Sequence, residues 1–290
     1  MKPTVYIIVG PTAVGKTKYA IELALKLKTE IISADARQCY KELNIGVARP
    51  SKLELEMVPH HFIASHSIYE NVNAGVFEHY ALAQTANLLE RYGTVVMVGG
   101  TGLYIKAFAE GMDAIPEVDP AIRSQIQKDV IEKGTAWLQK QVQQIDPIYW
   151  AAADLGEQQN TQRLSRALEV KLGTGQSIID FQHQSKKQRP FAVQKIGLEM
   201  PRLELYNRIN QRVLQMVAMG LEEEVKALLP LFNLNALQTV GYQEWLPYFE
   251  GRQSKAAVIS AIQQNTRHYA KRQMTWFKKD PTIQWHSVGV

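Results

Sequence analysis

The stretch VYIIVGPTAVGKTKYA, residues 5–20, decides the fold expected for the first part of the chain. Within it, GPTAVGKT has the spacing G-x-x-x-x-G-K-[ST] that is typical of phosphate-binding loops. The apolar run VYIIVG before the loop predicts a β-strand, and the apolar residues of KTKYAIELALKL recur at helical spacing. A strand, a loop and a helix in this order direct backbone N–H groups and the positive end of the helix toward a chain of phosphates.

Three further segments have the character of buried strands. They are TEIISAD (29–35), TVVMVGGTG (94–102) and FAVQKIGLEM (191–200). Strands that alternate with helices predict an α/β fold, here a P-loop NTPase-like, doubly wound parallel sheet flanked by helices. Ligands of such sheets bind at the carboxyl ends of the strands, so the segments that begin at Gly10, Asp35 and Gly99 should meet at one crevice.

Residues 114–190 differ in character from the rest of the chain. They contain almost no strand-like runs, and they open with AIPEVDP, in which Asp119 and Pro120 could cap and begin a helix. We therefore expect a helical insertion at 114–190 within a core formed by residues 1–113 and 191–290. Gly220 is expected to separate two helices after residue 201.

The composition limits the classes of protein to which the chain can belong. The chain has 290 residues, of which 46% are hydrophobic, enough for a substantial core. Its one cysteine, Cys39, cannot form an internal disulfide, and no Cys and His residues have metal-ligand spacing. We see neither a signal-type segment nor an apolar run that could span a membrane. These features predict a cytoplasmic protein without a membrane partner.

The positive charges are concentrated toward the end of the chain. The net charge is +5, and after Glu250 the basic residues far outnumber the one acid, Asp280. Interleaved aromatic residues, Tyr269 and Trp276 among them, could stack on bases while the basic groups hold phosphates. The same pattern fits a solvated basic helix whose aromatic residues belong to the core, and the sequence leaves both interpretations open.

The phosphate-binding loop is expected to hold a phosphate chain through residues Gly10, Pro11, Thr12, Ala13, Val14, Gly15, Lys16 and Thr17. The Lys16 ammonium would reach a terminal phosphate, and the Thr17 hydroxyl could hold Mg²⁺, with Asp35 contributing through water. An enzyme that cleaves a nucleoside triphosphate usually holds its metal with an Asp at the end of another core strand. The strand TVVMV ends in Gly-Gly-Thr-Gly, which carries no carboxylate.

Four side chains outside the loop are candidates for chemistry. Asp35 could act as a general base or orient a nucleophile, or it could merely cap the turn that follows. The Thr101 hydroxyl could donate to a leaving phosphate oxygen, or cap the helix after it. Arg208 and Arg212 lie four residues apart on one helix face and could clamp a diphosphate. They could equally be a solvated face paired with acids such as Glu204.

The motifs together resemble the bacterial tRNA dimethylallyltransferases. They occur in the family's order and approximate spacing over nearly the whole chain: GPTAVGKT, SADARQCYKELNIGVARP, VPHHFI, VGGTGLYIKAFAEG, QRLSRALEV, VGYQEW and TRHYAKRQMTWFKKDP. The resemblance implies transfer of a dimethylallyl group from dimethylallyl diphosphate to N6 of adenosine 37, in tRNAs that read codons beginning with U. Asp35, Thr101 and Arg208 would be catalytic, and Mg²⁺ would be the cofactor.

The same resemblance implies the contacts with the anticodon stem-loop of tRNA. Beside the target adenosine it places Asp35, Ala36, Arg37, Gln38 and Thr101. In contact with the anticodon loop it places Arg123, then Gln159, Asn160, Thr161, Gln162 and Arg163, and finally Gln238, Thr239, Val240, Gly241, Tyr242 and Gln243. The family commonly has Ser where this chain has Ala36, which removes one hydroxyl near the base. The protein is expected to act as a monomer.

Two other functions compete with tRNA modification. Prenylation of free adenine nucleotides would need neither the helical insertion nor the basic, aromatic tail. A P-loop kinase or a nucleotide-regulated binding protein would be favoured by the loop alone, but the missing acid after TVVMV and the whole-chain resemblance argue against it.

Overall fold

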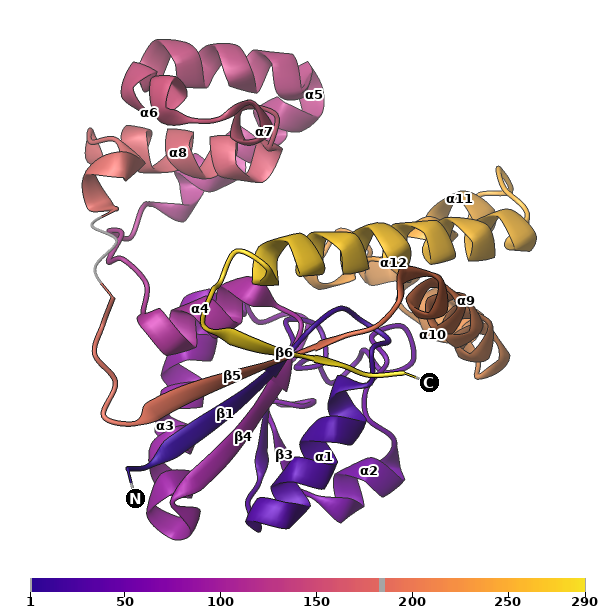
Figure 1. The fold of residues 1–290 in the computed structure, drawn as a ribbon. Helices are drawn as coiled ribbons and strands as arrows, with labels where there is room; N and C mark the ends of the chain where they lie inside the picture. Colours follow the sequence, from indigo (N-terminus) through magenta and orange to yellow (C-terminus); the bar gives the residue numbers. More distant parts are fainter. Residues whose placement is uncertain (1, 183–185, 290) are drawn as a thin grey trace. The chain divides into compact units, whose positions relative to one another are not determined.

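A six-stranded parallel sheet forms the centre of residues 1–111 and 187–290, in the computed structural model that describes residues 2–182 and 186–289 (Figure 1). The strand order is β3-β2-β4-β1-β5-β6. The strands are β1 (Thr4–Val9), β2 (Ile31–Ala34), β3 (His60–His61), β4 (Thr94–Gly99), β5 (Ala192–Glu199) and β6 (Ile283–Ser287). All of the pairings are parallel, which confirms the α/β fold expected from the alternating strands and helices.

The described chain divides into two compact units. A core unit comprises residues 1–111 and 187–290, and a helical unit comprises residues 112–186. The helices of the core unit are α1 (Lys16–Leu27), α2 (Lys52–Met57), α3 (Ala74–Tyr92), α4 (Gly102–Glu110), α9 (Arg202–Ala218), α10 (Leu221–Ala227), α11 (Leu246–Phe249) and α12 (Lys255–Phe277). The boundaries from the sequence, 113 and 191, lie within a few residues of these. Residues 183–185 of the expected insertion fall outside the described residues.

Strand β1, which leads into the phosphate-binding loop, is buried between two neighbouring strands. It pairs with β4 from Thr4 to Ile8 and with β5 from Thr4 to Val9. Val5, Ile7, Ile8 and Val9 are fully buried, as the continuous apolar run predicts for a strand covered on both faces. The chain leaves the strand at Gly10, whose φ of +143° favours glycine.

The carboxyl edge of the sheet is covered by elements from the second half of the core unit. Helices α9 and α12 pack on each other, and both lie at this edge in Figure 1. Gly220 separates α9 from α10, as the sequence predicted. The chain then ends in β6, which pairs with β5 and was not expected. Only Ile283 of its five residues is buried, so the strand lacks the apolar pattern by which it could be recognised.

The helical unit has its own core. Its elements are α5 (Pro120–Ile145), α6 (Pro147–Ala152), α7 (Leu155–Gln158), α8 (Thr161–Thr174) and the 3-10 helix η1 (Ile178–Phe181). The Asp119 carboxylate accepts a hydrogen bond from Ala121 N at 2.8 Å and Pro120 is the first helical residue, so the predicted cap of α5 is confirmed. Leu138, Val142, Leu164 and Leu168 pack together between α5 and α8.

Among the described residues, no helix combines the length and the apolar composition that crossing a membrane would require.

Strands β2 and β4 approach each other so closely at Gly99 that a side chain should not fit there. A Cβ on Gly99 would lie 2.1 Å from the carbonyl oxygen of Ala34, in the adjacent strand. Because neither backbone can move without breaking the ladder, Gly99→Ala should lower the free energy of unfolding by about 3 kcal/mol.

Urea denaturation followed by circular dichroism measures this change, with Gly75→Ala in α3 as the control. A Cβ at Gly75 would meet no atom closer than 3.3 Å. The control should therefore be neutral or slightly stabilising. Equal stabilities of the two variants would contradict the packing described for Gly99.

Candidate functional site

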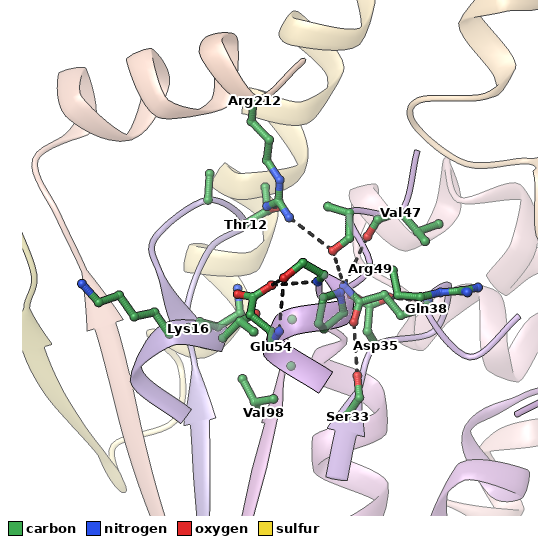
Figure 2. Close-up of a pocket in the computed structure, with 18 of the residues that line it drawn as sticks. Thr12, Lys16, Ser33, Asp35, Gln38, Val47, Arg49, Glu54, Val98 and Arg212 are labelled. Atoms are coloured by element: carbon green, nitrogen blue, oxygen red, sulfur yellow. Dashed lines mark hydrogen bonds between the residues drawn. The ribbon is translucent and has the colours of Figure 1, made fainter. Parts of the chain in front are cut away.

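A cavity of about 880 Å³ opens at the carboxyl edge of the sheet, within the core unit. Its walls come from the phosphate-binding loop, the end of β2, residues 44–55, the end of β4, and helices α9 and α12. Figure 2 shows side chains from several of these segments converging on one space. The expected meeting of the loops after β1, β2 and β4 is therefore observed.

The phosphate-binding loop presents only some of its residues to the cavity. Thr12, Ala13, Gly15, Lys16 and Thr17 line it. The remaining three residues support the loop from behind. Gly10 packs against the backbone of Leu198, Pro11 is buried, and Val14 belongs to the hydrophobic core. These three were expected to bind phosphate with the rest. They do not line the cavity, and their part in phosphate binding stays a prediction.

The Lys16 ammonium is held by backbone oxygens rather than by an acid. Its Nζ donates to the carbonyl of Gly10 at 3.0 Å and to that of Pro11 at 2.7 Å. Burial and the positive charge of Arg212 together lower the pKa of Lys16 to about 7, and the Asp35 carboxylate partly opposes them. The position is therefore one where an anionic ligand would stabilise the charged lysine.

Asp35 is both a turn-capping and a cavity residue. Its Oδ1 accepts hydrogen bonds from Arg37 N at 2.9 Å and Gln38 N at 3.2 Å, which is the capping role that the sequence left open. The carboxylate also lines the cavity. Within the described chain no hydrogen bond occupies Oδ2, so this oxygen remains able to accept a proton or a hydrogen bond.

Thr101 is tied to the Asp35 segment. Its Oγ1 accepts a hydrogen bond from Ala36 N at 3.0 Å. Thr101 occupies the N-cap position of α4, yet its side chain makes no capping bond. Because the bond to Ala36 uses a lone pair, the hydroxyl proton can still be donated. The capping alternative is thus correct for the position of Thr101 but not for its side chain.

The two arginines of α9 have different surroundings. Arg208 lines the cavity, but its guanidinium is nearly half exposed and bonds to Glu204 at 2.8 Å. Arg212 points toward the phosphate-binding loop, as Figure 2 shows: its Nη1 donates to Thr12 Oγ1 at 3.3 Å and its Nη2 to the Ala48 carbonyl at 3.5 Å. Arg212 is therefore better placed than Arg208 to hold an anion beside Lys16.

Residues 44–49 form a wall of the cavity that is held from both sides. Glu224 accepts from the backbone N–H of Ile45 at 2.8 Å and of Gly46 at 3.0 Å, and from the hydroxyl of Tyr242 at 2.6 Å. From the other side, Gln38 Nε2 donates to the carbonyls of Val47 and Ala48 (Figure 2). This double attachment fixes the wall that faces the phosphate-binding loop.

Tyr242 was expected to touch tRNA, and its surroundings correct that expectation for its side chain. It is fully buried, and a Cβ on Gly46 would lie 2.5 Å from its ring. Burial and the neighbouring Glu224 raise its pKa far above the usual range. Gly241 is buried as well, whereas Gln238 and Gln243 are exposed and Thr239 and Val240 partly so. The buried tyrosine anchors the wall instead.

Two residues of α12, Tyr269 and Gln273, belong to the site although they were not expected there from the sequence. Tyr269 lines the cavity, and burial together with the Asp35 charge raises its pKa to about 12. Gln273 also lines it and is buried. Helical spacing of four could have linked these residues, but only the docking of α12 shows which of its faces meets the loops.

Oxygen atoms suited to magnesium lie in the cavity. Thr17, Ser33 and Asp35 all line it. Mg²⁺ prefers oxygen ligands and retains several waters when it is bound with phosphates, so one hydroxyl and a water-linked carboxylate fit it. The described residues contain no group of three or more His, Cys, Asp or Glu at which a metal could bind by itself. A metal here would therefore depend on the phosphates.

Five of the residues expected to touch tRNA from the helical unit lie around the start of α8, and the sixth, Arg123, lies in α5. Gln159, Asn160, Gln162 and Arg163 are exposed and Thr161 partly so, and Asn160 caps the helix through Arg163 N at 3.1 Å. Arg123 forms a bidentate pair with Glu169, with distances of 3.0 and 3.1 Å. In the core unit, Ala36, Arg37 and Gln38 are partly exposed beside Asp35.

A model of the IPP transferase family matches residues 38–280. The chain belongs to this family. It is 47% identical to the tRNA dimethylallyltransferase of Christiangramia forsetii, with coverage of 96% of this chain and 91% of that protein. It is 42% identical to the tRNA dimethylallyltransferase of Cytophaga hutchinsonii, with coverage of 98% and 93%.

Solved structures show that this IPP transferase has the P-loop NTPase-like fold expected from the sequence. The crystal structure of the tRNA isopentenylpyrophosphate transferase of Bacillus halodurans matches with a TM-score of 0.71 at 35% identity, covering 99% of this chain and 90% of that one. A eukaryotic dimethylallyltransferase that acts on tRNA shares the fold at 24% identity, with a TM-score of 0.75 and coverage of 98% and 73%.

The lowered pKa of Lys16 predicts that anion binding takes up a proton. Its value of about 7 in the ligand-free protein should rise when a diphosphate binds, because the anion stabilises the ammonium. At pH 8 the lysine should therefore take up about 0.9 proton on binding, and affinity should fall with rising pH above 7.

Calorimetry with inorganic diphosphate, in buffers of different ionisation enthalpy, measures this uptake. The control is Lys16→Arg, whose guanidinium remains charged at every pH used. The ligand's own titration is common to both proteins, so the difference between them belongs to Lys16. Identical proton uptake by both proteins would show that Lys16 is already charged at pH 8.

Proposed function

We propose that this protein transfers the dimethylallyl group of dimethylallyl diphosphate to N6 of adenosine 37 in tRNA. The substrates would be tRNAs that read codons beginning with U, recognised through the anticodon stem-loop. The observation that carries the proposal is one cavity lined both by a phosphate-binding loop with Lys16 and by the carboxylate of Asp35. The tRNA dimethylallyltransferases to which the chain is similar support this choice of substrates.

The loop and its neighbours would bind the diphosphate. Lys16 and Arg212 supply positive charge, and the first turn of α1 supplies backbone N–H groups beside Thr17. Arg208, which also lines the cavity, would join them if its guanidinium turned from Glu204. Mg²⁺, held by Thr17 and by Asp35 through water, would neutralise charge that develops on the departing diphosphate.

Apolar side chains in the same cavity suit a five-carbon group. Ile45, Val47, Val98 and Met216 all line it. They offer the allyl chain apolar contacts, while the charged groups hold its diphosphate. Apolar and cationic walls next to each other are what a prenyl diphosphate requires.

The transfer is a displacement at the allylic carbon. The N6 nitrogen forms a bond to this carbon as the bond from carbon to the diphosphate oxygen breaks, and the diphosphate leaves with the electron pair. Oδ2 of Asp35 accepts the proton that the amine loses. The Thr101 hydroxyl donates a hydrogen bond to the leaving oxygen while its own oxygen remains bonded to Ala36 N.

The target adenosine would have to be turned out of the anticodon loop to reach the cavity. Ala36, Arg37 and Gln38 would lie against the base. The start of α8, the exposed Gln238 and Gln243, and the partly exposed Thr239 and Val240 would contact the loop around it. The basic side of α12 would hold backbone phosphates, which gives binding that weakens as salt is added. We propose that the protein does this as a monomer in the cytoplasm.

A transfer assay tests the proposal directly. The protein, Mg²⁺ and radiolabelled dimethylallyl diphosphate are incubated with unmodified tRNA that has adenosines at positions 36–38, and the modified nucleoside is located by nuclease digestion and mass spectrometry. We expect label on N6 of adenosine 37. Equal labelling of free AMP would favour the nucleotide prenyltransferase, and ATP turnover without transfer would favour the kinase.

Replacement of Asp35 separates chemistry from binding. Asp35→Asn preserves the acceptor for Arg37 N and Gln38 N but removes the base, so kcat should fall at least about 100-fold. The affinity for diphosphate should change by less than about threefold, whereas Lys16→Met should lose both kcat and affinity.

The matched control is Glu54→Gln, which replaces another carboxylate of the cavity wall. Glu54 accepts from Ser51 N in the cap of α2, a role that glutamine can retain. This variant should keep kcat close to that of the parent. A fall in Glu54→Gln as large as that in Asp35→Asn would remove Asp35 from its assigned role.

A further inference from the structure

Gln273 of α12 joins two loops of the site by hydrogen bonds. Its Oε1 accepts from the backbone N–H of Thr12 at 2.8 Å, in the phosphate-binding loop after β1. Its Nε2 donates to the carbonyl of Gly100 at 3.0 Å, in the loop after β4. These two contacts determine the orientation of the amide. In a flipped amide the NH₂ group would face the Thr12 N–H, which is also a donor, and the amide oxygen would face the Gly100 carbonyl, which is also an acceptor.

The glycines after β4 let α12 come this close. A Cβ on Gly100 would lie 2.1 Å from Gln273 Nε2, and a Cβ on Gly102 would lie 2.2 Å from Trp276 Nε1. Both glycines thus leave room for a close approach to the backbone near Thr101. The structure shows that the group approaching the backbone is helix α12.

Thr12 receives a second contact from another helix. Arg212 of α9 donates to its hydroxyl at 3.3 Å, while Gln273 holds its backbone N–H. The conformation of the loop at Thr12 thus depends on two helices that are remote in the sequence. Loss of the Gln273 amide would leave the Thr12 N–H without its acceptor in a partly buried position, which favours a different course of the loop.

The last turns of α12 and the turn after it form a shallow basic groove of about 450 Å³. It is lined by His268, Lys271, Arg272, Thr275, Trp276 and Lys279. The first five recur at intervals of three and four, so they form one stripe of α12, and Lys279 follows in the turn after the helix. Tyr269 and Gln273 line the cavity from a neighbouring side of α12. Trp276 lines the groove and also packs on Gly102, in the loop after β4.

We propose that Gln273 is a positioning residue that couples occupancy of this basic groove to the geometry of the diphosphate site. The inference rests on the proposed function, in which tRNA occupies the groove. A polyanion bound along the stripe restrains α12, and Gln273 passes this restraint to Thr12 N and Gly100 O. The loop is then held in the form that binds diphosphate, so tRNA and diphosphate strengthen each other's binding.

Binding measurements on matched variants test the coupling. The dissociation constant of inorganic diphosphate with Mg²⁺ is measured by calorimetry with and without saturating unmodified tRNA. In the parent protein we expect tRNA to tighten diphosphate binding about tenfold. In Gln273→Met, which keeps the approximate shape of the side chain but loses both bonds, the ratio should fall below about twofold.

Gln263→Met is the control on the same helix. Gln263 Nε2 donates to the carbonyl of Asn210 in α9 at 3.2 Å and touches neither loop, so the parent ratio should persist. The affinity of Gln273→Met for tRNA alone should also match that of the parent, which a general loss of structure would not allow. An unchanged ratio in Gln273→Met, an equal loss in both variants, or no effect of tRNA in the parent would each overturn the proposal.

A second substitution tests the coupling if Gln273→Met does not fold. Gln273→Glu keeps an acceptor for Thr12 N but cannot donate to Gly100 O, so the ratio should again fall, and an unchanged ratio would count against the coupling. The transfer assay with the parent protein distinguishes a failure of the proposed function from a failure of the role proposed for Gln273. No transfer to tRNA refutes the proposed function, whereas transfer with unchanged coupling refutes only the role of Gln273.

Discussion

The site depends on a cation, Lys16, which has no acid partner in direct contact among the described residues. Lys16 lies at the end of the phosphate-binding loop with its ammonium on two backbone carbonyls, and Arg212 adds a second positive charge. Such an arrangement is unfavourable until an anion arrives, since burial disfavours the charged lysine. The strand and helix that carry Lys16 are therefore arranged for a ligand with several negative charges.

The other walls of the cavity determine what that ligand carries. Glu224 and Gln38 hold residues 44–49 opposite the loop, and the segment at Asp35 is fastened to Thr101. These attachments place apolar side chains and one carboxylate next to the cationic end. A phosphate loop that serves triphosphate hydrolysis in other proteins is thus combined here with surroundings that suit an allylic diphosphate and an amine.

Helix α12 connects the cavity with the surface. One side of it contributes Tyr269 and Gln273 to the site, and a neighbouring side carries the basic groove. Phe277 is core while Lys271 and Arg272 are exposed, as expected of a solvated basic helix whose apolar residues belong to the core. Contact of this helix with nucleic acid stays a prediction.

Local sequence was sufficient for the features that short-range physics controls. The buried run of β1, the glycine spacing of the loop, the cap at Asp119 and the break at Gly220 all follow from neighbouring residues. The strand β6 could not be predicted, because its stability comes from pairing with β5 and not from its own apolar pattern. The burial of Tyr242 likewise depends on Glu224 and Gly46, which are distant in the sequence.

The sequence by itself determined the strands β1, β2, β4 and β5, the phosphate-binding loop and the family to which the chain is similar. Only the tertiary structure decided that Arg212 rather than Arg208 faces the loop, and that Gln273 joins the loops after β1 and β4. Both arginines lie on one side of α9, one helical turn apart, so periodicity cannot distinguish them. The choice is made by the docking of α9 and α12 on the sheet, and that docking is set by long-range packing.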